Sequence, residues 1–133
     1  MPQPAPYDFV FDYLPRRIVT KQQFGMHYIY LDKKLVLMLR KTVKGDGLNG
    51  IFVATVKVHH ETLLKDVPAL KAFTLDTGEK YESHWKFLDE EDDAFEKSAI
   101  KICELISRGD NRIGKATKGA AALWACRVAV QDC

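Results

Sequence analysis

Adjacent histidines and a run of carboxylates are the residues of this sequence that could hold a metal. His59, His60 and Glu61 follow one another. Neighbouring residues on a helix point about 100° apart, so this pair cannot share a zinc ion as histidines at i and i+4 do. Residues 89–93 are all acidic, but they lack the alternating oxygen ligands and the mid-loop glycine of a calcium site. We therefore expect no metal or cofactor here, and interpret both stretches as polar helix starts.

Nucleophilic chemistry finds equally little support in the spacing of the residues. The three cysteines, Cys103, Cys126 and Cys133, form no CxxC pair, and no histidine or carboxylate is tied to them by local spacing. An odd number of cysteines without a framework spacing is typical of a reducing cytoplasm. The loop at residues 44–50 (KGDGLNG) matches neither common phosphate-binding pattern. We assign no catalytic residue and expect a protein that is not an enzyme.

Basic residues are the second candidate for function. Residues 1–66 hold ten basic and six acidic side chains, although the whole chain, with 20 basic and 18 acidic residues, has a net charge of only +2. A basic rim of a sheet could bind nucleic acid weakly, whereas lysines on a sheet rim can also simply discourage edge pairing. The candidate nucleic-acid residues are Arg16, Arg17, Lys21, Lys33, Lys34, Arg40 and Lys41.

The elements that must position these residues begin with a Pro-rich start and several strands. Within the 133 residues, residues 1–6 are expected to be flexible, and residues 7–14 form a short helix ended by Pro15, with Phe9, Val10 and Tyr13 toward the core. Strands are expected at residues 17–24, 27–31, 35–40 and 51–58. The run at 35–39 is apolar at every position, which predicts a central strand covered on both faces.

The second half of the chain predicts two helices around a hairpin. Residues 59–66 form a short helix, and residues 72–75 and 80–88 form strands joined by a turn at 76–79. A long helix is expected over residues 90–107, with Asp89 as its N-cap and Gly109 as its stop. One apolar face follows the helical repeat and consists of Phe95, Ala99, Ile102 and Ile106.

This order of elements favours an α+β fold. Hairpins dominate, which predicts a two-layer sandwich with a mainly antiparallel sheet of five or six strands and helices packed on one face. The length suits one domain, residues 1–115, followed by an apolar C-terminal extension, residues 116–133, which needs a surface to dock on. The expected core consists of Phe9, Ile29, Val36, Met38, Phe52, Ala54, Trp85, Phe95, Ala99 and Ile102.

Three stretches resemble the TfoX N-terminal domain family. In QFGMHYIYLDKK (residues 23–34), the family pattern is matched by Phe24, Gly25, Ile29, Tyr30, Asp32 and Lys34, whereas Met26, Tyr28 and Lys33 replace glycines. The strand-to-helix step at residues 56–62 and the Arg-Ile-Gly ending within 110–115 are also similar to that family. The resemblance covers residues 7–115 and implies a small two-layer α+β domain. It carries over no catalytic residue, since none is agreed for the family, whose name comes from regulators of natural competence.

Three functional hypotheses follow. The first is a non-enzymatic cytoplasmic interaction or regulatory domain that associates with itself, as a homodimer, or with another protein. The second is a weak nucleic-acid-binding module that uses the basic rim. The third is a small-ligand binder or enzyme with a pocket between the sheet and the long helix, near His27, Tyr30 and His84. No apolar run is long enough to span a membrane, and no secretory signal begins the sequence, so we expect no membrane partner.

Overall fold

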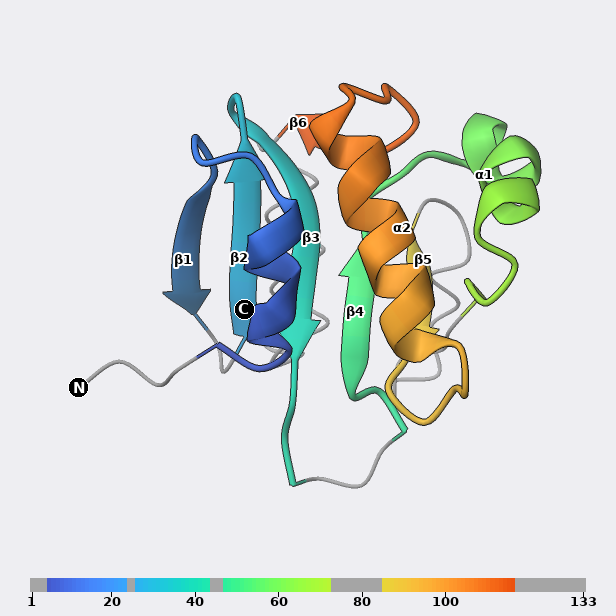
Figure 1. Ribbon diagram of the computed structural model, residues 1–133, viewed down its shortest axis with the longest axis horizontal. Helices are drawn as coiled ribbons and strands as arrows, with labels where there is room; N and C mark the ends of the chain where they lie inside the picture. The colour runs from blue at the N-terminus through green and yellow to red at the C-terminus, as the bar shows by residue number, and fades with distance from the viewer. Residues whose placement is uncertain (1–4, 24–25, 44–46, 73–84, 117–133) are drawn as a thin grey trace.

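The computed structural model describes residues 5–23, 26–43, 47–72 and 85–116, and these form one antiparallel sheet with helices on one face (Figure 1). The neighbours in the sheet run β1-β2-β3-β4-β5, and β6 pairs with β3 beyond the end of β4. Every strand pair in the described residues is antiparallel, so the predicted α+β class is confirmed. The strands are β1 (Val19–Gln23), β2 (Met26–Leu31), β3 (Lys34–Arg40), β4 (Gly50–Val53), β5 (Lys86–Asp89) and β6 (Lys115–Ala116).

The 3₁₀ helix η1 (Asp8–Tyr13) and the helix α2 (Phe95–Ser107) cover one face of the sheet. In Figure 1, η1 lies in front of β2 and β3, and α2 lies beside it toward β4. A second 3₁₀ turn, η2 (Lys57–His59), leads directly into α1 (His60–Asp66). Each described helix is too short or too polar to cross a membrane.

β3 is the centre of the sheet, as its apolar run predicts. All residues from Leu35 to Arg40 are buried. Leu37 and Leu39 belong to the core beneath the helices, while Met38 belongs to a second core on the opposite face. A strand that is covered on both faces has no solvent side, which explains why its sequence does not alternate between apolar and polar residues.

The two cores contain most of the residues expected there. The helix-side core is built on the leucines, isoleucines and valines of β2–β5, η1 and α2. The opposite-side core is rich in methionine and aromatic residues, among them Met26, Tyr28, Trp85 and Phe87. Eight of the ten expected core residues are buried, whereas Phe9 and Phe95 are partly buried and pack against the helix-side core. Tyr13 does not face the core as expected, since it is 42% exposed.

The long helix begins five residues later than predicted, at Phe95, so Asp89 is not its N-cap. Asp89 ends β5 opposite Gly50, and its Oδ1 accepts a hydrogen bond of 3.0 Å from the Glu91 amide. Asp92 likewise accepts from the Ala94 amide at 2.8 Å. These carboxylates stabilise turns that compete with the helix. The apolar face and the stop at the other end are confirmed: Gly109 has a φ of 78°, and the Asp110 amide donates to the Leu105 carbonyl at 3.0 Å.

The expected strand 51–58 ends at Val53. The Ala54 amide still donates to the Val36 carbonyl at 3.0 Å, but the Ala54 carbonyl then accepts from Gly114 at 2.7 Å. The Thr55 hydroxyl donates to the Arg112 carbonyl at 2.7 Å. The segment after α2 thus takes over the hydrogen bonds that a longer β4 would use, and the chain turns away into η2.

Several sequence predictions fall outside the described residues. They are the turn at 76–79, most of the hairpin around it, His84, Cys126, Cys133 and the extension from residue 117 onward. Ala116, the expected first residue of the C-terminal extension, belongs to β6. Of the expected hairpin, the described residues include β5. Trp85 and Phe87 both belong to the opposite-side core, as their alternate positions in the sequence predict.

Candidate functional site

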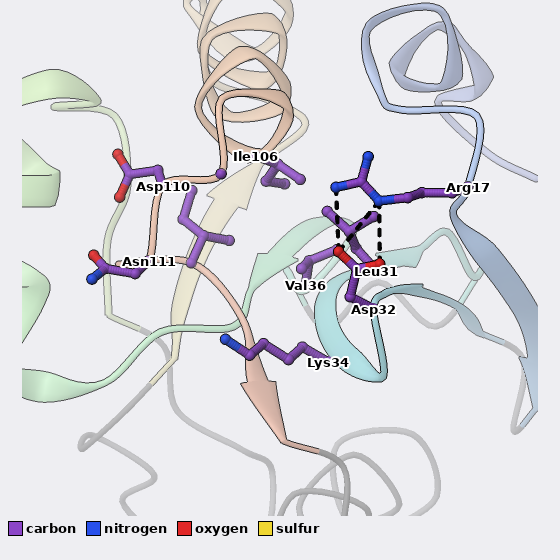
Figure 2. A pocket seen from close by; sticks show the side chains of 10 residues that line it. Arg17, Leu31, Asp32, Lys34, Val36, Ile106, Asp110 and Asn111 are labelled. Atoms are coloured by element: carbon purple, nitrogen blue, oxygen red, sulfur yellow. Dashed lines mark hydrogen bonds and ion pairs between the residues drawn. The ribbon is translucent and has the colours of Figure 1, made fainter.

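A pocket of about 160 Å³ lies at one end of the sheet, where the segment before β1, the β2–β3 turn and the C-terminal end of α2 meet (Figure 2). We call it the sheet-end pocket. Its walls are apolar, and its rim carries cationic, acidic and amide side chains. The walls are formed by Leu31, Val36, Ile106 and Ile113, and the rim by Arg17, Asp32, Lys34, Asp110 and Asn111.

A tight hairpin turn places one ion pair on this rim. Asp32 and Lys33 are the two residues between β2 and β3, and their φ angles are 52° and 69°. Positive φ at both central positions is typical of a type I′ turn, whose twist suits a hairpin. Asp32 then faces Arg17, with Nε–Oδ1 and Nη2–Oδ2 distances of 3.2 Å (Figure 2). Both side chains are more than 60% exposed, at 61% and 63%, so this pair stabilises the fold by at most about 1 kcal/mol.

A second group of charges holds the other side of the pocket. Arg112 Nη2 lies 2.7 Å from Oδ2 of both Asp110 and Asp66. The hydrogen bond from Arg112 lowers the pKa of Asp110 below its ordinary value, and the two carboxylates raise the pKa of Arg112. Asp110 therefore stays ionised and paired at neutral pH, which does not suit it to general acid–base work.

Four of the seven candidate nucleic-acid residues gather at this end of the sheet. They are exposed and lie just before β1 or at the β2–β3 turn and the start of β3, which the antiparallel register brings to the same end. We call them the sheet-end cations: Arg16, Arg17, Lys33 and Lys34. Lys34 extends past the pocket in Figure 2, and no ion pair to it is found among the described residues.

The other three candidates lie elsewhere. Lys21 lies on β1 with its Nζ 5.4 Å from the Tyr30 ring centroid. Lys41 follows the far end of β3 and is paired with Glu90 at 2.6 Å. Arg40 is only 3% exposed, and its Nη1 donates to the Leu48 carbonyl at 3.0 Å. The expectation that Arg40 belongs to a basic surface is therefore wrong, because its guanidinium group holds the β3–β4 connection from inside.

Glu90 has a structural role that the sequence pattern does not reveal. Its carboxylate accepts from Lys41 Nζ at 2.6 and 2.7 Å and from the Tyr7 hydroxyl at 2.8 Å. The Lys41 hydrogen bond is the main reason that the pKa of Glu90 lies below its ordinary value. Only 16% of its side chain is exposed, so Glu90 links the residue before η1 to the end of β3 instead of forming a solvated helix cap.

The remaining candidates for chemistry are not brought together. Among the described residues, no three histidine, cysteine or acidic side chains are placed to hold a metal ion. Cys103 is fully buried, and burial raises the pKa of its thiol to about 12, so the thiol is protonated at neutral pH. His27 and Tyr30 lie on β2, outside the lining of the sheet-end pocket.

The chain is an α+β domain with a small pocket at one end of its antiparallel sheet, and the Arg17–Asp32 ion pair lies on the rim of this pocket. Comparisons of the chain with protein-family models, curated proteins and solved structures found no match in any of the three.

Proposed function

We propose that the chain is a non-enzymatic, cytoplasmic interaction domain, which associates with a second copy of itself through the outer edge of β1. The observation that carries this proposal is a difference between the two edges of the sheet. Within the described residues, β1 pairs only with β2. The outer edge of β5 is instead occupied, because Lys71 and Phe87 exchange two backbone hydrogen bonds of 2.9 Å.

The composition of β1 supports pairing with another strand. Edge strands that remain single are usually protected by proline, by several charges or by a bulge. β1 contains no proline and one charged residue, Lys21, whose Nζ lies against the Tyr30 ring. Val19 is 56% exposed, and the Thr20 and Gln22 side chains are also exposed. The strand thus offers backbone donors and acceptors with little charge to repel a partner.

A second copy is the occupant that this edge suits best. Two antiparallel β1 strands related by a twofold axis present the same surface to each other, which is the commonest form of protein self-association. Main-chain hydrogen bonds would then join the two sheets into one. The resemblance to the TfoX N-terminal domain family points to the same broad class of regulatory domain.

The experiment compares two lysine double variants by analytical ultracentrifugation. Thr20→Lys/Gln22→Lys places two like charges on the edge of β1. Val43→Lys/Val58→Lys is the control, because it adds the same charge at residues that are 104% and 79% exposed away from β1. We expect a dimer for the native chain and the control, and a folded monomer for the β1 variant. A native chain that sediments as a monomer at all concentrations would refute the proposal.

The sheet-end cations favour nucleic-acid binding as a second candidate function. Three of them, Arg16, Lys33 and Lys34, form no ion pair within the part of the chain that the structure describes. Binding of labelled DNA or RNA should weaken steeply as salt rises. Lys33→Glu/Lys34→Glu should reduce binding and flatten the salt dependence. Absence of binding by the native chain at low salt would exclude this function.

A further inference from the structure

A larger depression lies between α2 and the segment that follows α1. It has a volume of about 390 Å³, within the range of about 300–1,000 Å³ that is usual for ligand pockets. We call it the α2 groove. One wall is the segment Asp66, Val67, Pro68 and Ala69. The other wall consists of Ala94, which precedes α2, and of Lys97, Ser98 and Lys101 on α2.

The walls of the groove are mainly apolar. Val67 is 1% exposed, and Ala69 and Ala94 are partly buried. Ser98 is 8% exposed and lines the groove. The groove can therefore accept an apolar side chain and offers one hydroxyl that can bond a polar group beside it.

The charge on the rim of the groove is positive. Lys97 and Lys101 are four residues apart on α2 and lie on the same side of the helix. Neither lysine forms an ion pair in the described part of the chain, not even with Asp93 or Glu104 on their own segment. On the opposite rim, the Asp66 carboxylate is already bound to Arg112 at 2.7 Å. Two ammonium groups without an ion pair in the described residues thus stand beside an apolar cavity, whose one lining carboxylate is bound to Arg112, a cation that it shares with Asp110.

We propose that the α2 groove binds an acidic, amphipathic segment of a partner protein. An apolar side chain of that segment enters the groove, and its carboxylates contact Lys97 and Lys101. This is the charge-complementary form of the helix-in-groove mode of recognition. A nucleic-acid strand fits less well, since the groove lining contains no aromatic side chain on which bases could stack. The proposal is independent of self-association through β1.

Two synthetic peptides test this proposal by fluorescence anisotropy with the full chain. The first is a fluorescein-labelled helical peptide with leucines at i, i+3, i+4 and i+7 and glutamates elsewhere. The second carries lysines in place of the glutamates. We expect the acidic peptide to bind and the basic one not to bind. Lys97→Glu/Lys101→Glu should weaken binding about tenfold, because two attractive contacts become repulsive.

The matched control is Lys33→Glu/Lys34→Glu, which makes the same change of charge outside the lining of the α2 groove and should leave peptide affinity unchanged. Ala69→Trp fills the groove while both lysines remain, and should also abolish binding. Circular dichroism establishes that each variant is folded. The proposal is overturned if the acidic peptide does not bind, if the basic peptide binds equally or if the control variant loses as much affinity. It is also overturned if the native chain is a dimer and the Lys97→Glu/Lys101→Glu variant is a monomer, since the groove would then hold a second copy.

Discussion

Removal of a single oxygen atom, in Tyr7→Phe, tests how the start of the chain is fixed to the sheet. Tyr7 Oη lies 2.8 Å from Glu90 Oε1 and 3.0 Å from the Arg40 carbonyl oxygen. Its single proton is best donated to the carboxylate, which is the stronger acceptor. The ring also meets Phe95 edge to face, with centroids 5.1 Å apart, and phenylalanine retains that contact.

The expected loss follows from the state of Glu90. A hydrogen bond to a charged group contributes about 1.5–3 kcal/mol. Lys41 still holds the carboxylate in the variant, so no charge is left unpaired, and we expect a loss of about 1–2 kcal/mol. With a urea m-value of about 1–3 kcal/mol/M, the midpoint should fall by roughly 0.3–2 M.

Urea denaturation of a double-mutant cycle measures this interaction. Tyr7→Phe, Glu90→Gln and their combination should be non-additive by about 1 kcal/mol, because the two side chains share one hydrogen bond. The folded-state pKa of Glu90 is lowered, so its ionised form stabilises the fold above the unfolded-state pKa of about 4.3. That contribution is lost as the pH falls through the folded-state pKa. Additive losses at pH 7, or a Tyr7→Phe effect that does not shrink in acid, would contradict this explanation.

Of three further substitutions, two should stabilise the chain and one should destabilise it, and urea or thermal unfolding measures each effect. Tyr28→Phe should stabilise the chain by about 1 kcal/mol, since the phenol is 3% exposed and its hydroxyl has no hydrogen-bond partner in the described residues; a loss of stability would mean that it has one. Lys33→Gly should also stabilise, by about 0.5–1 kcal/mol, because φ is 69° at this turn position, where glycine carries no steric cost; an unchanged midpoint would argue against strain there. Gly50→Ala should cost about 3 kcal/mol or more, since its Cβ would lie 2.1 Å from the Leu88 carbonyl oxygen; a variant as stable as the native chain would refute the tight β4–β5 approach.

The elements that the sequence predicts well depend on local pattern alone. The apolar run of β3 and the repeat of Phe95, Ala99, Ile102 and Ile106 are each decided by neighbouring residues, and the structure confirms both. The start of α2 depends on more than local pattern. A stretch of carboxylates can cap a helix, and it can equally stabilise turns by accepting hydrogen bonds from backbone amides. The pairing of Asp89 with Gly50 and the hydrogen bond from the Glu90 amide to the Asn49 carbonyl favour the turns here.

The candidate sites were harder to predict because they combine residues from distant parts of the chain. Arg40 is the last residue of an apolar strand and has the sequence context of a surface cation, but its guanidinium group is buried and donates a hydrogen bond to the Leu48 carbonyl. The sheet-end pocket joins Arg17, Asp32 and Asp110, which no spacing rule connects. The lysines of the α2 groove follow a simple i, i+4 pattern, yet only the fold shows that Val67 and Ala69 lie opposite them.

The position of β3 has a consequence for the synthesis of the protein. Its first residues pair with β6, and Leu35 lies opposite Lys115. At about 5–20 residues per second, the ribosome makes this last partner roughly 4–15 s after the apolar stretch of β3 is complete. During that interval the stretch is an exposed apolar segment of high β propensity in the nascent chain, and such segments are prone to aggregate. Truncation before Lys115 removes β6 together with residues 117–133 and leaves the start of β3 without this partner, so it should reduce the yield of native protein.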